Sequence, residues 1–245
     1  MLPIRDHNPS EITPFVTYAL MGANILIFVW MAVTATTDQA VSEIYYSFGM
    51  VPALISQGEG YAGMITAIFI HAGFMHLAGN MLFLWIFGDN LEDKMGHFGF
   101  LIFYFACGIG ANIAQYALEP GSDVATVGAS GAIAGVMGGY ILLFPKAKVD
   151  IFIYFIIIFR ILPLPAWIML GVWFGLQLFN TINGTEAGVA YMAHAGGFVI
   201  GAVLTLPLFL RLGGTRFWHD TDYHPDHPPA DYGTLPSRIP VVRRR

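Results

Sequence analysis

The chain is dominated by long apolar runs that are almost free of charge. The first run, from Phe15 to about Ala35, has the roughly 20 residues that a helix needs to cross a hydrocarbon core of about 30 Å. Only 11% of all residues are charged, whereas soluble domains carry about 25%. Because an ordinary water-facing surface cannot be built from this composition, the sequence predicts an integral membrane protein.

Six such runs follow one another and predict an all-α polytopic bundle of six transmembrane helices. They cover residues 15–35, 75–87, 98–118, 129–144, 164–180 and 189–210. The segment from Ile151 to Phe159 is too short to span alone, so we expect it to be interfacial or an extension of the fifth helix. We further expect a short N-terminus at 1–13, a helical domain at 14–212 and a disordered polar tail at 213–245.

The basic residues support this count and suggest an orientation. With six spans, all 11 of them fall on the side that holds both termini: Arg5, Lys94, Lys146, Lys148, Arg160, Arg211, Arg216, Arg238 and Arg243, Arg244 and Arg245. The connections on the opposite side carry only acids: Asp38, Glu43, Glu59, Glu119, Asp123 and Glu186. Basic residues favour the cytoplasmic side, so we expect both termini to be cytoplasmic. The N-terminus lacks the pattern of a cleaved signal peptide, so the first span is expected to be retained.

Polar and ionisable residues inside a membrane are costly and are candidates for function. His76 and Asn80 lie near the start of the second run, Ser130 near the start of the fourth and His194 near the start of the sixth. These three runs cross the membrane in the same direction, from outside to inside. All four side chains are therefore expected at a similar depth, in the outer part of the bilayer.

Ser130 and His194 together predict nucleophilic catalysis, which requires a hydroxyl and a base within hydrogen-bond reach. Ser130 is the only serine in an apolar run. Small residues allow helix backbones to approach closely, and they mark both runs: Gly131, Gly135 and Gly139 in the fourth, and Gly197 and Gly201 in the sixth. No acidic residue lies in the core of a run. We therefore expect a Ser–His pair without a carboxylate.

Donors for a developing oxyanion are also available. His76 and Asn80 are four residues apart and share one helix face. The Asn80 amide is a neutral donor, and free backbone N–H groups are expected where Ser130 begins a helix.

Three segments resemble the motifs of rhomboid intramembrane proteases, the bacterial type with six helices. Gly128-Ala129-Ser130-Gly131 resembles their GxSG motif. The segment from Ala193 through Gly197 to Gly201 is similar to AHxxGxxxG. His71, His76 and Asn80 match HxxxxHxxxN, and the segment from Gly88 to Glu92 also fits. The resemblance covers about residues 14–212. It departs in the first long connection, where many members carry a Trp-Arg pair and this chain reads Glu59-Gly60-Tyr61-Ala62-Gly63.

The resemblance implies a serine endopeptidase that cleaves membrane proteins in or near their transmembrane segments. It implies that Ser130 attacks the carbonyl carbon, that His194 takes the proton, and that His76, Asn80 and the Ser130 N–H hold the oxyanion. By the same resemblance, His71 supports the surrounding loop, and a gate and cap lie near Trp167 and residues 181–190. The supporting glycines would be Gly128, Gly131, Gly197 and Gly201. It also implies the inner (plasma) membrane of a bacterium with the site toward the outer side, and no cofactor, metal or nucleic acid.

Other interpretations remain open. The chain could be a catalytically silent rhomboid-like protein that binds transmembrane clients. A transporter or channel is disfavoured because intramembrane carboxylates are missing from the runs. Ser130 could simply bond a carbonyl one turn back, and His76 and Asn80 could join helices. The tail places His219, His224 and His227 among acids, which we interpret as a solvated segment rather than a metal site. The lone Cys107 can form no internal disulfide.

Overall fold

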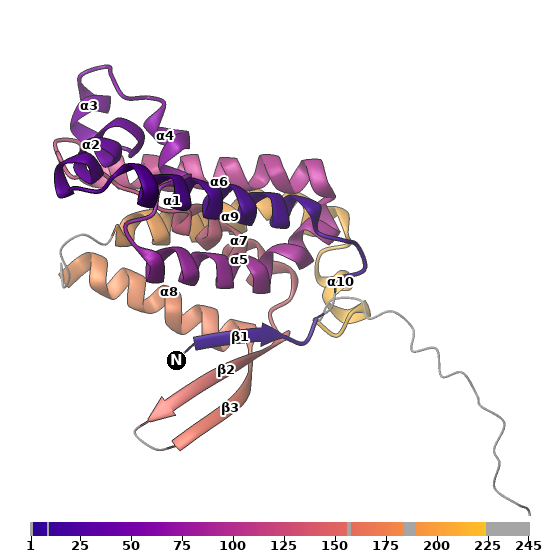
Figure 1. The fold of residues 1–245 in the computed structure, drawn as a ribbon. Coiled ribbons are helices and arrows are strands. Elements are labelled where there is room, and N and C mark those ends of the chain that lie inside the picture. Colours follow the sequence, from indigo (N-terminus) through magenta and orange to yellow (C-terminus); the bar gives the residue numbers. More distant parts are fainter. Residues whose placement is uncertain (1, 9, 156–157, 184–189, 224–245) are drawn as a thin grey trace, which may run out of the picture.

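The computed structural model describes residues 2–8, 10–155, 158–183 and 190–223 as a helical bundle with a small sheet beside it (Figure 1). The longer helices are α1 (Phe15–Thr34), α5 (Phe74–Met95), α6 (His97–Leu118), α7 (Ser130–Leu143), α8 (Ala166–Asn183) and α9 (Tyr191–Arg211). Short helices are α2 (Asp38–Phe48), α3 (Pro52–Ser56), α4 (Gly63–Thr66), η1 (Ala67–Phe69) and α10 (Thr215–Asp220). The strands are β1 (Leu2–Asp6), β2 (Lys148–Phe155) and β3 (Ile158–Pro165).

Helix α7 lies at the centre of the bundle and contacts α5, α6, α8 and α9. Nearly all of its residues are buried, from Gly131 through Tyr140. Apolar residues line it on all sides, as expected for a helix surrounded by other helices. In contrast, α1 leaves large apolar side chains such as Leu26 and Val33 exposed. Apolar side chains on the outside and a packed helix in the middle are the arrangement expected of a bundle in lipid.

The apolar runs of the sequence predicted the long helices to within a few residues, except at the C-terminal end of the second. That helix, α5, continues beyond Phe87 to Met95 and so includes Asp89 and Glu92. Among the described helices, α1, α6 and α9 are long and apolar enough to cross a membrane. The pair formed by Gly63–Phe69 and α5, bent by 93°, could supply a fourth span. The helical class is thus confirmed, and the count of six spans stays a prediction.

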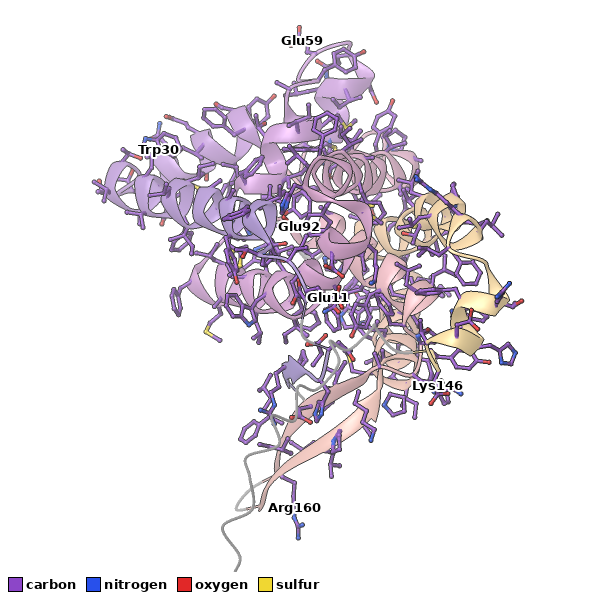
Figure 2. All side chains as sticks on the ribbon, turned by 90° about the vertical axis from the view of Figure 1, so that its right-hand side faces the viewer. Glu11, Trp30, Glu59, Glu92, Lys146 and Arg160 are labelled. Carbon is purple, nitrogen blue, oxygen red and sulfur yellow. The ribbon has the colours of Figure 1, made fainter. Side chains whose placement is uncertain are left out.

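The segment from Ile151 to Phe159 was expected to be interfacial or an extension of the fifth helix, and the helical alternative is wrong, while an interfacial position stays a prediction. Its described residues belong to the antiparallel strands β2 and β3, in which Ile151 pairs with Leu162. The N-terminal strand β1 completes a sheet with the order β1-β2-β3. Figure 2 shows Arg160 near the outer end of this hairpin, away from the helices. A run of β-branched and aromatic residues suits a strand, and the N-terminal residues supply its partner.

Hydrogen bonds tie the sheet to one end of the bundle. Tyr140 Oη donates to Asp6 Oδ2 at 3.0 Å, and Asn90 Nδ2 donates to the same oxygen at 3.0 Å. Tyr140 and Asn90 lie in the C-terminal parts of α7 and α5. On the sheet itself, Asp150 pairs with Arg5 at 2.8 Å. The sheet therefore lies at the end of the bundle opposite to Ser130.

The polar tail was expected to be disordered from residue 213, yet its first part is helical. Helix α10 packs against the bundle through the buried Phe217, and Trp218 Nε1 donates to the Leu142 carbonyl at 3.0 Å. Large aromatic side chains in this segment supply the apolar contact area that a disordered tail lacks. His219 is exposed, and the expectations for His224 and His227 fall outside the described residues.

The long connection from Thr36 to Ile70 is held in place without a Trp-Arg pair. The backbones of Met50 and Thr126 form an isolated antiparallel bridge. The Ser56 hydroxyl donates to the Pro120 carbonyl at 2.6 Å, and Asn112 Nδ2 donates to the Met64 carbonyl at 2.9 Å. These contacts join the connection to α6 and to the segment before α7.

Candidate functional site

Ser130 is the first residue of α7, so its hydroxyl lies at the N-terminal end of a buried helix. The preceding turn depends on Gly128, whose φ of +127° falls in the region that favours glycine. A Cβ atom at Gly128 would lie 2.8 Å from the His76 ring and 3.5 Å from Ser130 Oγ. Gly128 N–H donates to the Ala67 carbonyl at 2.9 Å. Because glycine has no Cβ, the backbone at Gly128 can lie close to both the His76 ring and Ser130 Oγ.

His194 lies in the first turn of α9 and faces Ser130. Its Nε2 atom is 2.7 Å from Ser130 Oγ, and its Nδ1 atom is 2.8 Å from Gln177 Oε1. The Trp173 ring lies beside the imidazole, with centroids 6.0 Å apart. Serine, histidine and glutamine therefore form a continuous hydrogen-bonded series across α7, α9 and α8.

The glycines of α7 and α9 set the separation of these helices. A Cβ at Gly197 would overlap the carbonyl oxygen of Gly131, and one at Gly201 would overlap that of Gly135. Gly138, which is not part of the predicted glycine pattern, lies against the carbonyl oxygen of Phe198 in the same way. The close approach predicted from the glycine pattern is present, and it lies on the helix faces that carry Ser130 and His194.

His76 and Asn80 occupy different positions relative to the serine. His76 lines the same cavity as Ser130 and His194. Asn80 is buried and does not line the cavity. Its Nδ2 atom donates to the His76 carbonyl at 3.0 Å. Of the two side chains predicted as oxyanion donors, only His76 lines the cavity.

His71 lies behind His76 rather than in the cavity. It is buried, and its ring centroid is 5.1 Å from that of His76. Its Nδ1 atom is 3.3 Å from the Phe69 carbonyl oxygen. His71 thus contacts the last residue of η1, and its supporting role stays a prediction.

A cavity of about 650 Å³ opens at this end of the bundle. Its lining includes Ser130, His194, His76 and, from the segment before α7, Thr126 and Val127. One acidic residue, Glu119, also belongs to the lining. The volume falls in the range of ligand-binding pockets.

Two glutamines at the site were missed by the sequence analysis. Gln177 on α8 contacts His194, and Gln115 Oε1 on α6 accepts from Ala193 N–H at 3.3 Å. Both are buried polar residues in apolar helices. The same rule that selected Ser130 and His194, a polar side chain inside an apolar run, points to both glutamines.

No cluster of three or more His, Cys, Asp or Glu residues suited to a metal ion occurs within residues 2–8, 10–155, 158–183 and 190–223.

Comparison with known proteins gives one family. Residues 58–211 match the Rhomboid domain. Rhomboid protease GluP of Bacillus subtilis (strain 168) is 32% identical over 195 residues, which are 79% of this chain and 36% of that protein. Rhomboid protease AarA of Providencia stuartii is 28% identical over 208 residues, 79% of this chain and 72% of that protein. The chloroplastic Rhomboid-like protein 11 of Arabidopsis thaliana is 34% identical over 146 residues, 57% of this chain and 50% of that protein.

The chain spans about half the length, or less, of several of these curated relatives. The matched region nevertheless extends from the connection before α4 to the last residue of α9. It includes all three segments singled out in the sequence and the helices that carry them. This chain is a membrane-spanning member of the rhomboid family.

Proposed function

We propose that this protein is an intramembrane serine endopeptidase. It would hydrolyse peptide bonds in or near the transmembrane segments of membrane proteins. The observation that carries the proposal is the distance of 2.7 Å between Ser130 Oγ and His194 Nε2 beside a cavity of about 650 Å³. The protease names of relatives such as GluP and AarA support the same class of reaction.

The first step of the proposed reaction forms an acyl-enzyme. Ser130 Oγ attacks the carbonyl carbon of the substrate peptide bond while His194 Nε2 accepts the hydroxyl proton. The resulting imidazolium then donates that proton to the departing amine, and the peptide bond breaks. In the second step, water attacks the ester, His194 takes a proton from the water, and Ser130 regains its hydroxyl as the acid leaves.

Negative charge develops on the substrate carbonyl oxygen in both steps. The N-terminal end of α7 offers backbone N–H groups that have no partner within the helix. The His76 ring lies against the Gly128 backbone and lines the cavity. We propose these groups as the principal oxyanion donors. Asn80, whose amide bonds the His76 carbonyl, would act mainly by holding the first turn of α5.

The proposed orientation places the Ser130 end of the bundle toward the outer side of a bacterial plasma membrane. The residues at the opposite end support it: Lys94, Lys146 and Arg211 lie near the C-terminal ends of α5, α7 and α9. Single cysteines at Glu59 and Arg160, in a chain with Cys107→Ala, test this. In intact cells an impermeant maleimide should label the residue at 59 and spare that at 160; the reverse labelling contradicts the orientation.

A fluorophosphonate probe tests the nucleophile directly. The purified wild-type protein should be labelled and should cleave a model transmembrane substrate, whereas Ser130→Ala and His194→Ala should do neither. Ser122→Ala is the matched control, because Ser122 lies in the lining of the same cavity. If wild type and Ser130→Ala are labelled equally and neither cleaves, the protease proposal is wrong. Retained binding of the substrate would then favour a silent rhomboid-like protein.

A further inference from the structure

Gln177 stands out among the residues around the proposed catalytic pair. It is only 8% exposed although it lies on α8, a helix whose other faces are rich in exposed apolar residues such as Leu176 and Leu178. A buried carboxamide in an apolar helix is unfavourable unless its polar atoms are bonded. Gln177 Oε1 lies 2.8 Å from His194 Nδ1, which accounts for its burial.

This contact determines which nitrogen of His194 carries the proton. A carboxamide oxygen can only accept a hydrogen bond. His194 Nδ1 must therefore be the protonated nitrogen of the neutral ring. The lone pair of Nε2 then faces Ser130 Oγ at 2.7 Å, as a base for the serine proton requires.

A second residue on α8, Trp173, lies beside the imidazole. Trp173 precedes Gln177 by four residues and so projects from the same face of the helix. Its ring lies 6.0 Å from the His194 ring, and it is also 6.2 Å from Phe198. Phe174 stacks on Phe198 at 4.7 Å, which holds this part of α8 against α9. Gln177 is therefore presented to His194 by a packed helix face.

We propose that Gln177 is a positioning residue for the reaction, in the role of the third member that the Ser–His pair lacks. It holds His194 in the tautomer with the proton on Nδ1 and supports the imidazolium as the proton is transferred. The inference rests on the proposed protease function for its effect on rate. Its effect on the tautomer does not depend on that function.

The tautomer is measured by nitrogen NMR of the protein labelled with ¹⁵N-histidine, with His194 assigned by its loss in His194→Ala. In the wild-type protein at a pH where the ring is neutral, Nδ1 should carry the proton. In Gln177→Leu, which has no acceptor, the tautomer with the proton on Nε2 should increase. A wild-type ring protonated on Nε2 would overturn the proposal. It would mean that the carboxamide is turned so that its NH₂ group donates to Nδ1.

Kinetics provide the second measurement. Gln177→Leu should lower the rate of fluorophosphonate labelling and kcat by about ten- to a hundredfold, the range seen when outer partners of metal-bound histidines are removed. KM should stay unchanged. Gln177→Glu keeps the acceptor oxygen and should restore much of the loss. Leu178→Ala, on the exposed face of the same helix, is the matched control and should react like the wild type.

The outcomes separate the two proposals. Equal labelling of wild type and Ser130→Ala refutes the protease function, while the NMR result still decides the role of Gln177. Normal labelling of Gln177→Leu with an unchanged tautomer refutes the role of Gln177 and leaves the protease function standing. A higher KM for Gln177→Leu with an unchanged kcat would also contradict the inference, because it would assign Gln177 to substrate binding.

Discussion

The Cα atom of Gly201 lies directly against the carbonyl group of Gly135, so that no side chain fits between the two backbones. The same closeness recurs between Gly197 and the carbonyl oxygen of Gly131, one turn nearer the site. Ser130 and His194 lie in the first turns of α7 and α9, next to these glycines. The helix separation that the glycines allow therefore also sets the distance between the two side chains. Packing and chemistry therefore depend on the same helix faces.

Gly201→Ala should destabilise the protein and impair the site. The added methyl group must push α9 away from α7, and overpacking of this kind costs about 1–3 kcal/mol. The proposed activity should fall as well, because the shift changes the approach of His194 to Ser130. Thermal unfolding in detergent measures the stability. The buried Cys107, the only cysteine, reports unfolding by its reaction with a fluorogenic maleimide, with circular dichroism as a check.

Gly175→Ala is the control for this substitution. A Cβ at Gly175 has nothing within 4 Å, and replacing glycine by alanine inside a helix favours the helix by about 0.5–1 kcal/mol. The control should therefore unfold at the same or a higher temperature than the wild type. Equal destabilisation by both substitutions would show that close helix packing is not the reason for glycine at 201.

His76→Ala and Asn80→Ala should differ in their effects on turnover. Removing an oxyanion donor typically lowers kcat by about 10²–10³, and His76 lines the cavity whereas Asn80 does not. We expect a loss of this size for His76→Ala, with little change in unfolding temperature. Asn80→Ala should lower turnover less. Steady-state kinetics on a model transmembrane substrate give both kcat values. A larger fall in kcat for Asn80→Ala than for His76→Ala would make Asn80 the principal oxyanion donor.

Much of this arrangement follows from local sequence patterns. The lengths of the apolar runs predict α1 and α6, because each spanning helix must by itself be long enough to cross the hydrocarbon core. The glycine spacing after Ser130 and His194 predicts the contact of α7 with α9, because small residues on one helix face can only serve a close neighbour. Family resemblance adds the order of the segments.

Other parts depend on partners far away in the sequence. Ile151 pairs with Leu162 in the next strand and, on the other side of β2, with Pro3 of the N-terminal strand; no local pattern reveals the second partner, about 150 residues away. Gln177 contacts His194 only because α8 packs against α9. Asn80 does not line the cavity, and its amide bonds the carbonyl four residues back; spacing along a helix does not distinguish this position from one in the cavity.

Glu92→Ala should be strongly destabilising although Glu92 is far from the site. Its fully buried carboxylate accepts from Val16 N–H at 2.9 Å, Thr17 N–H at 2.8 Å and Thr17 Oγ1 at 2.7 Å. It thereby caps the N-terminus of α1, where negative charge is also favoured. Leaving these donors unpaired costs about 3 kcal/mol. The matched control is Glu59→Ala, which removes an exposed carboxylate and should change the stability by no more than about 0.5 kcal/mol. Similar unfolding temperatures for the two variants would contradict the capping role.

Asp6 should make the stability depend on pH. Burial raises the pKa of Asp6 from 3.8 to about 6, although the hydrogen bond from Tyr140 acts in the opposite direction. The folded protein thus holds this proton more tightly than the unfolded chain. Its contribution is present in full below pH 4 and is lost as the pH rises to about 6, above which the contribution of Asp6 no longer changes. By linkage the loss is about 3 kcal/mol.

Asp6→Asn isolates this effect, because asparagine resembles the protonated acid and its oxygen can still accept from Tyr140 and Asn90. The variant should match the wild type in stability near pH 4 and exceed it near pH 7.5. Thermal unfolding over this pH range gives the difference between the two proteins. Asp123→Asn, at an exposed position, measures the background of the same charge change. The stability difference between Asp6→Asn and wild type could instead stay constant from pH 4 to pH 7.5. That result would contradict the prediction, because it would mean that the contacts of β1 with α5 and α7 accommodate an ionised Asp6 as readily as a neutral one.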